Sequence, residues 1–159
     1  MNSLRTHHNT LLRMQFHHLA VNCRNQATIE AYYTKHFEFK RARAFDIGGG
    51  LQIIFLEGPG VHLELFQTGP QAEQGIQLTS PVKDGRDYPS VIRHLAFKVD
   101  DVDAKLAAMG ADAQRVTLGP LRFDGFIPGW KSVWLSDPEG NIVEISQGYV
   151  DNTPAPAGR

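Results

Sequence analysis

The sequence predicts an α+β fold made of two βαβββ modules within one domain. The first observation is a strand pattern that occurs twice, as FHHLAVNC at 16–23 and as IRHLAFKV at 92–99. The second is that a helical pattern follows each copy, and strand-like segments separated by turn residues follow each helix. Such internal similarity indicates repeated units that share a core. The length of 159 residues suits one domain and is too short for two ordinary independent ones.

The first half has the order β-α-β-β-β. Leu19 and Val21 alternate with polar or small residues, which is typical of a strand. The next segment, 25–37, is apolar at helical spacing, at Ile29, Tyr32, Tyr33 and Phe37. Three strands are then expected at about 39–46, 51–56 and 61–67, because glycine-rich turns at 48–50 and 58–60 separate them.

The second half repeats this order. After the strand HLAFKV, the segment DDVDAKLAAMG predicts a helix that Asp100 or Asp101 caps and Gly110 ends. A strand is expected at DAQRVTL (112–118), and the Gly- and Pro-rich stretch 119–129 is expected to interrupt the pattern. The last two strands are KSVWLSD (131–137) and NIVEISQ (141–147), joined by a turn at 138–140.

The predicted domain spans residues 15–148, with module one at 15–68, a linker at 69–90 and module two at 91–148. Residues 1–14 are expected to form a flexible N-terminal tail, and 149–159 a disordered C-terminal tail. The linker has little periodicity and is long for a structureless loop. It is therefore interpreted either as an inter-module linker or as a flap over a site.

Composition favours a small-molecule partner. Sixteen Lys and Arg against 17 Asp and Glu give a net charge of −1 without long runs of one sign, so no nucleic-acid partner is expected. The N-terminus resembles neither a signal peptide nor a membrane span, and no membrane partner is expected. Cys23 is the only cysteine, which excludes an internal disulfide and fits a cytoplasmic location.

Four residues form the candidate site: His18, Glu64, His94 and Glu144. The interval from histidine to glutamate is 46 residues in the first half and 50 in the second. The apolar neighbours of each residue alternate onto the opposite strand face and can pack under the helix of the module, which leaves all four on the helix-free side. If the first and last strands of a module lie side by side, each module presents one imidazole and one carboxylate together.

Two imidazoles and two carboxylates form a ligand set for one divalent metal such as Ni, Co, Zn, Fe or Mn. Four protein ligands would leave positions open for water or substrate, as in a catalytic metal site. The alternative is that each histidine is a hydrogen-bonded strand residue and each glutamate lies on an exposed sheet face. His17 is one residue out of phase, is expected to point under the sheet, and is not counted as a ligand.

The segments FHHLAVNC, HLELF, IRHLAFKVDDVDA and DPEGNIVEI resemble those of the vicinal oxygen chelate superfamily, also called the glyoxalase, bleomycin-resistance and dioxygenase superfamily. The resemblance runs from about Phe16 to about Gln147. It implies a mixed sheet in each module that curls around a metal-centred pocket, and an assembly that is often a homodimer. It leaves open whether the pocket joins modules of one chain or of two.

Within that superfamily, the four candidate ligands look like those of glyoxalase I, the lactoylglutathione lyase. The resemblance implies a divalent metal that binds the substrate oxygens, and a ligand glutamate that moves a proton between neighbouring carbons through an enediolate. Carried over, Glu144 is the best candidate base and Glu64 is its symmetry mate. Asn22 and Thr68 stand where that family usually has an arginine and an asparagine that contact glutathione, so the substrate stays unknown.

Two other functions remain open. His18, His94 and Glu144 alone match the two-histidine, one-carboxylate triad of an extradiol-type non-haem iron dioxygenase, although Glu64 would crowd the positions for oxygen and catechol. An antibiotic-binding or resistance protein of the same superfamily is the other alternative. Separately, four aromatic residues could wall an apolar pocket or simply belong to the core, namely Phe123, Phe126, Trp130 and Trp134.

Overall fold

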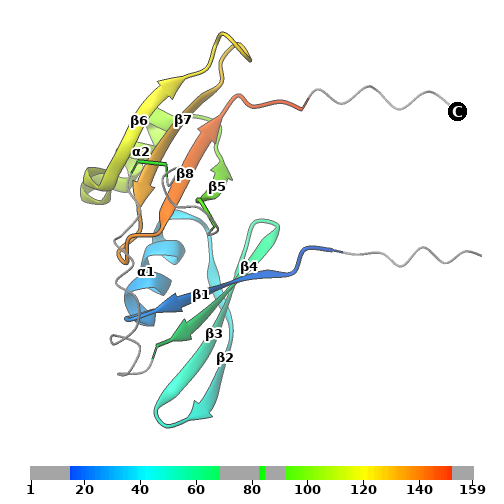
Figure 1. The fold of residues 1–159 in the computed structure, drawn as a ribbon, viewed down its shortest axis with the longest axis vertical. Helices are drawn as coiled ribbons and strands as arrows, with labels where there is room; N and C mark the ends of the chain where they lie inside the picture. Colours follow the sequence, from blue (N-terminus) through cyan, green and yellow to red (C-terminus); the bar gives the residue numbers. More distant parts are fainter. Residues whose placement is uncertain (1–14, 69–82, 85–91, 152–159) are drawn as a thin grey trace, which may run out of the picture.

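The structure, a computed structural model, describes residues 15–68, 83–84 and 92–151 (Figure 1). The expected tail at 1–14, most of the linker at 69–90 and residues 152–159 of the expected C-terminal tail lie outside these residues. The described residues form two four-stranded mixed sheets, each with a helix inserted after its first strand. This confirms the predicted α+β fold with two βαβββ modules.

Module one contains β1 (His18–Cys23), α1 (Gln26–His36), β2 (Lys40–Gly48), β3 (Leu51–Gly58) and β4 (Val61–Gln67). Its strands lie in the order β1-β4-β3-β2. The first and last strands, β1 and β4, pair in parallel, and the other neighbours are antiparallel. This is the pairing that the candidate site requires.

Module two contains β5 (Leu95–Lys98), α2 (Val102–Met109), β6 (Val116–Arg122), β7 (Lys131–Ser136) and β8 (Ile142–Gln147), in the sheet order β5-β8-β7-β6. The strand expected at 112–118 begins only at Val116, because a 3-10 helix at Gly110–Arg115 precedes it. The strand β6 also continues through Gly119, where the Gly- and Pro-rich stretch was expected to interrupt it. Gly119 has a positive φ of 89°, and the pairing of β6 with β7 shifts in register around this residue.

Both helices begin at side-chain caps. The Asn25 side chain accepts a hydrogen bond from the Thr28 amide at 3.1 Å, and the Asp101 side chain accepts one from the Ala104 amide at 2.9 Å. α2 ends at Gly110, whose φ of 60° suits glycine, so the cap and end predicted for this helix are confirmed. Neither α-helix of the described residues is long and apolar enough to span a membrane.

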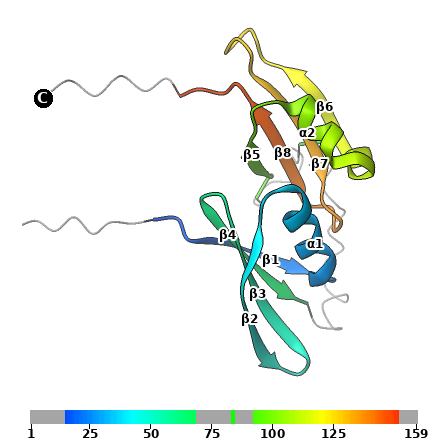
Figure 2. The same cartoon turned by 180° about the vertical axis from the view of Figure 1, so that it is seen from behind.

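Helix α1 lies between the two sheets and joins their cores (Figures 1 and 2). The predicted apolar face of the helix is buried, and it shares one cluster with inward-facing residues of both sheets, among them Ile29, Tyr33, Leu63, Leu65, Val133, Val143 and Ile145. At the junction, the rings of Phe37 and Phe97 lie 4.7 Å apart. Hydrophobic burial therefore holds the modules together through α1, and the inner face of each sheet is turned toward this shared core.

Candidate metal-binding site

The first half of the site is a pair formed by His18 and Glu64. On the parallel strands β1 and β4, Ala20 lies opposite Glu64, so His18 reaches the glutamate along a diagonal two residues away. His18 Nε2 lies 3.1 Å from Glu64 Oε2. The histidine side chain is 36% exposed and the glutamate side chain 15%, so the pair is open to solvent on one side.

The second half repeats this geometry. Ala96 on β5 lies opposite Glu144 on β8, and His94 directly precedes β5. His94 Nε2 lies 2.9 Å from Glu144 Oε2, and the two side chains are 21% and 12% exposed. Each module therefore brings one imidazole and one carboxylate together on the same diagonal.

An aromatic ring from the third strand accompanies each pair. Phe55 on β3 lies opposite Glu64, with its ring centroid 5.7 Å from that of His18 and nearly perpendicular to it. Trp134 on β7 lies opposite Glu144, with its ring 6.3 Å from that of His94. Trp134 was named from the sequence only as a pocket wall, and Phe55 was missed, because the strand register that places both rings is not visible in the sequence.

The other ring nitrogen of each histidine is also engaged. His94 Nδ1 lies 3.1 Å from the Asp84 carbonyl oxygen. His18 Nδ1 lies 2.7 Å from Nδ1 of His17, so one of these rings donates to the other. In both pairs this leaves Nε2 directed at the glutamate.

The expectation that His17 points under the sheet is wrong. The residue is exposed, contacts His18, and stacks on the His62 ring at a centroid distance of 5.3 Å. The physical reason is that β1 begins at His18, so the alternation of the strand does not yet fix the side chain that precedes it.

Each member of the second pair changes the pKa of the other. Burial raises the pKa of Glu144, but hydrogen bonds from His94 and Ser132 outweigh it, so the pKa lies below its ordinary value. The hydrogen bond to Glu144 raises the pKa of His94 against the effect of burial, and the Asp84 carbonyl adds to this rise. A proton on His94 Nε2 is therefore stabilised in the metal-free pair, and a metal ion would have to displace it.

A single chain does not bring the four residues together. Both sheets turn their inner faces to the shared core around α1, and each pair lies on the reverse face of its sheet, the face opposite to Leu63 or Val143. Among the described residues, no group of three or more His, Cys, Asp and Glu could hold a metal ion. One chain therefore contains two histidine–glutamate pairs, each on the sheet face turned away from the shared core.

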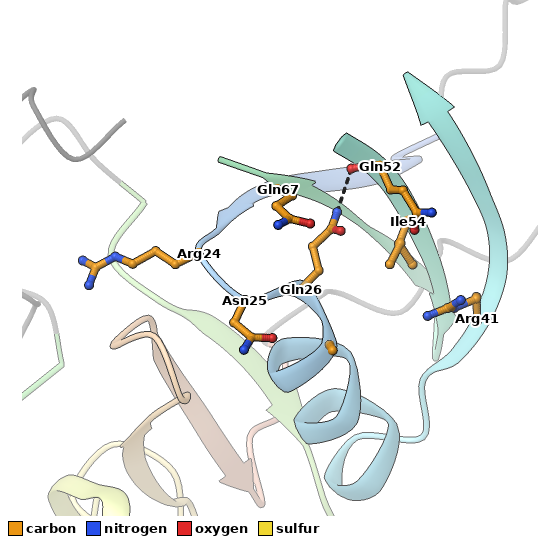
Figure 3. Close-up of a pocket in the computed structure, with 8 residues that line it drawn as sticks. Arg24, Asn25, Gln26, Arg41, Gln52, Ile54 and Gln67 are labelled. Carbon is orange, nitrogen blue, oxygen red and sulfur yellow. Dashed lines mark hydrogen bonds between the residues drawn. The ribbon is translucent and has the colours of Figure 1, made fainter. Parts of the chain in front are cut away.

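Two cavities of the described residues lie elsewhere. One of about 350 Å³ opens beside the start of α1, lined by polar side chains that include Arg24, Gln26, Arg41 and Gln67 (Figure 3). Gln26 is held there by hydrogen bonds from its amide nitrogen to the carbonyls of Gln52 and Leu65. A second cavity of about 670 Å³ is lined by the start of α1, Arg115, Thr117 and the turn that joins β7 and β8. Neither cavity includes a residue of the histidine–glutamate pairs.

Comparison with protein families places the fold and the site in context. Residues 15–145 match the model of the Glyoxalase/Bleomycin resistance protein/Dioxygenase superfamily. The chain belongs to this superfamily. The resemblance expected from the sequence is thereby confirmed, whereas the comparison with curated proteins found no match.

Solved structures share the fold along nearly their whole length. A glyoxalase family protein from Enterococcus faecalis is 27% identical with a TM-score of 0.60, and the match covers 83% of this chain and 96% of that one. A lactoylglutathione lyase from Agrobacterium tumefaciens is 24% identical with a TM-score of 0.53, over 85% of this chain and 93% of that one. An antibiotic binding protein from Streptomyces sp. CB03234 is 20% identical with a TM-score of 0.56, over 87% and 98%. The superfamily thus includes both enzymes and binding proteins, and likeness at this level shows the fold alone.

Proposed function

We propose that this protein is a metal-dependent, glyoxalase-like lyase or isomerase that moves a proton within a small oxygen-chelating substrate. The observation that carries the proposal is the repeated pair in which a histidine Nε2 faces a glutamate oxygen, at 3.1 Å in module one and 2.9 Å in module two. The repetition supports one shared task, since the aromatic neighbour and the engaged Nδ1 atom are repeated as well.

The donor set fits one divalent metal, of the group Ni, Co, Zn, Fe and Mn. Imidazole nitrogens and carboxylate oxygens suit these ions, and a second hydrogen bond at the far ring nitrogen is the usual way in which a metal-binding histidine is oriented. The residues that would hold the ion are His18, Glu64, His94 and Glu144. When bound, the metal would supply positive charge that stabilises developing negative charge on the substrate oxygens.

The complete site is proposed to form between two chains of a homodimer. Each chain has two half-sites that face away from its core, so the module-one pair of one chain and the module-two pair of its partner can converge. A two-fold axis then generates two equivalent sites. The apolar groups beside the first pair support a covered face, because Phe45 is 43% exposed and packs edge-on against Phe55.

In the proposed reaction, Glu144 accepts a proton from one carbon of the substrate and returns it to the neighbouring carbon. The lowered pKa keeps its carboxylate ionised and able to accept a proton at neutral pH. The proton leaves and returns, so no oxidant or reductant is consumed. In the proposed dimer, Glu64 from the other chain, the symmetry mate, would be the second carboxylate and would serve the opposite face of the substrate.

Trp134 is proposed to donate a hydrogen bond to a substrate oxygen. Its side chain is buried, and no acceptor among the described residues lies within normal hydrogen-bond geometry of the indole N–H. The N–H nevertheless helps to lower the pKa of the neighbouring Glu144, so it lies close to the proposed base. A buried donor whose hydrogen bond is poorly aligned is costly, and a ligand oxygen in better alignment would reduce this cost.

A cytoplasmic location completes the proposal, since the single buried Cys23 can form no disulfide within the chain. The antibiotic-binding alternative is favoured by one observation, the aromatic cluster at the start of β7, where the rings of Phe123 and Trp130 lie 4.6 Å apart and Phe126 is 81% exposed. A binding protein of that kind would need neither the metal nor the base.

Metal analysis tests the proposal first. We expect the purified protein to contain about one divalent ion per chain, and His94→Ala to lose it, because a site with one imidazole fewer binds the ion less tightly. The matched control is His62→Ala, a histidine on the same strand as Glu64 but outside either pair, which should keep the metal. Unchanged metal content in His94→Ala would contradict the ligand assignment.

Activity assays then separate the functions. The metal-loaded protein is tested with a glutathione hemithioacetal, with acyl-CoA epimers and with catechols, and oxygen uptake is monitored. Proton exchange at a carbon next to a carbonyl, without oxygen uptake, supports the proposal, and loss of exchange in Glu144→Gln assigns the base. Oxygen consumption with catechols would favour the dioxygenase, and antibiotic binding by metal-free protein without turnover would favour the binding protein.

A further inference from the structure

We propose that the turn at Lys83 and Asp84, fastened by Arg93, is a positioning device that fixes the ring orientation of His94. The inference rests on the proposed function, in which His94 is a metal ligand. It gives a role to the short described part of the segment that joins the two modules. The residues concerned are not ligands and act through His94 alone.

One backbone oxygen is the centre of this arrangement. The Asp84 carbonyl accepts a hydrogen bond from Arg93 Nε at 3.1 Å and lies 3.1 Å from His94 Nδ1. The Asp84 carboxylate pairs with the Arg93 guanidinium, so Arg93 contacts both the backbone carbonyl and the side chain of Asp84. Asp84 is only 4% exposed, which makes this contact better shielded from solvent than a surface ion pair.

The chemistry of the carbonyl sets the orientation of the ring. A carbonyl oxygen accepts hydrogen bonds and cannot donate, so the hydrogen in the contact with His94 must be carried by Nδ1. Nε2 is then directed at Glu144 at 2.9 Å, where it donates its hydrogen to the carboxylate in the metal-free pair. The Asp84 carbonyl thus presents Nε2 to the side on which the metal would bind.

The turn is anchored from a second direction. Thr117 on β6 donates a hydrogen bond through its hydroxyl to the Lys83 carbonyl at 2.6 Å. Lys83 has a φ of 56°, an uncommon conformation for a residue with a side chain. Contacts from β6 on one side and from Arg93 on the other hold the Asp84 carbonyl at a fixed place relative to β5.

Among the described residues, the first half-site has no equivalent of this turn. Nδ1 of His18 instead meets the exposed His17 side chain. Loss of the Arg93 contact should therefore weaken the second half-site and leave the first unchanged. His17 offers the corresponding substitution in module one, and it should not affect the His94 ring.

The test combines a hydrogen-exchange measurement on the imidazole with a metal titration. In metal-free protein at a pH where His94 carries both ring hydrogens, ¹⁵N–¹H correlation spectra should show an Nδ1–H that exchanges slowly with solvent, because it is donated to the carbonyl of the buried Asp84. In Arg93→Met this exchange should become faster, and Arg93→Lys should slow it in part. Competition with a chromophoric chelator should show metal affinity lower by about 10- to 100-fold in Arg93→Met. Arg122→Met, which removes a 66% exposed arginine of the same module, is the control and should match the parent.

The outcomes separate this inference from the proposed function. A His94 Nδ1–H that exchanges in the parent protein as fast as that of an exposed imidazole, or an Arg93→Met variant with parental exchange and parental affinity, would overturn the inference. If the parent protein binds no metal, the proposed function fails, while the exchange spectra still decide whether the turn orients His94. The circular dichroism spectrum of Arg93→Met should match that of the parent. If Arg93→Met instead loses its fold, the NMR signals of both modules will change. Thr117→Val, which removes only the second anchor, then provides the deciding spectrum.

Discussion

A complementation experiment tests whether the metal site is shared between two chains. One variant carries His18→Ala and Glu64→Gln, which removes the half-site of module one. The other carries His94→Ala and Glu144→Gln, which removes the half-site of module two. Neither variant alone can form a complete site, so both should lack metal and activity when pure.

The magnitude follows from the two half-sites in each chain. Mixing equal amounts with free exchange gives about half heterodimers, and each heterodimer contains one complete site and one site without ligands. The mixture should therefore recover about a quarter of the metal content and activity of the parent. A site within a single chain would recover nothing, because no chain in the mixture has both half-sites.

The assay measures bound metal by elemental analysis after equilibrium dialysis, and counts heterodimers by native mass spectrometry. A matched control mixes His18→Ala with Glu64→Gln as separate variants. Both changes are in module one, so every site in every dimer is damaged and no recovery is expected. Heterodimers that form without recovering metal would refute the shared site, and a chain that stays monomeric at all concentrations would refute the dimer.

Three further predictions concern the metal-free protein. The pKa of Glu144 is lowered and that of His94 is raised. Their pairing should therefore stabilise the fold between the ordinary pKa values of 4.5 and 6.5, and the gain should decline as pH falls through the Glu144 value or rises through the His94 value. Urea unfolding of the parent and Glu144→Gln across pH measures this. Phe37→Ala should lower the free energy of unfolding by about 3–5 kcal/mol, since the ring is 4% exposed and packs on Phe97. Burial raises the pKa of Cys23 to about 12, so iodoacetamide should label it only after unfolding.

Each of these predictions has a contradicting result. A stability difference between the parent and Glu144→Gln that does not vary with pH would mean that the pair does not titrate as described. Phe126→Ala is the control for the core substitution, because this ring is 81% exposed and its loss should change stability little. If Phe37→Ala and Phe126→Ala lower the free energy of unfolding equally, the contact between Phe37 and Phe97 does not hold the two modules together. Labelling of Cys23 in the folded protein at the rate of an exposed thiol would contradict its burial.

The pairing within each module could be predicted from the sequence because it depends on short-range rules. Strand alternation places His18 on the face opposite to Leu19, and a repeated order of elements implies a repeated partner for each histidine. These rules need only residues within one strand and the order of the strands. The two His–Glu pairs follow directly from them.

The direction in which the two pairs face could not be predicted, because it depends on how the modules pack. Periodicity shows which residues share a face of a strand, but not which face of one module meets the other. That arrangement is set by α1, whose buried residues contact both sheets, and by the contact of Phe37 with Phe97. Asp84 and Arg93 were missed for a similar reason. Their contact with His94 joins the domain to a segment without periodicity, where no local pattern indicates a partner.

The separation of the half-sites has a physical consequence for the proposed enzyme. One histidine and one glutamate offer a divalent ion half of the proposed ligand set, and the pair in module two also holds a proton that the ion must displace. A single chain should therefore bind metal weakly, whereas two chains that present complementary pairs supply all four ligands. Metal binding and association are then thermodynamically linked, so that each strengthens the other. In the proposed dimer the base and the metal ligands would come from both chains, so the reaction centre would exist only in the assembled protein.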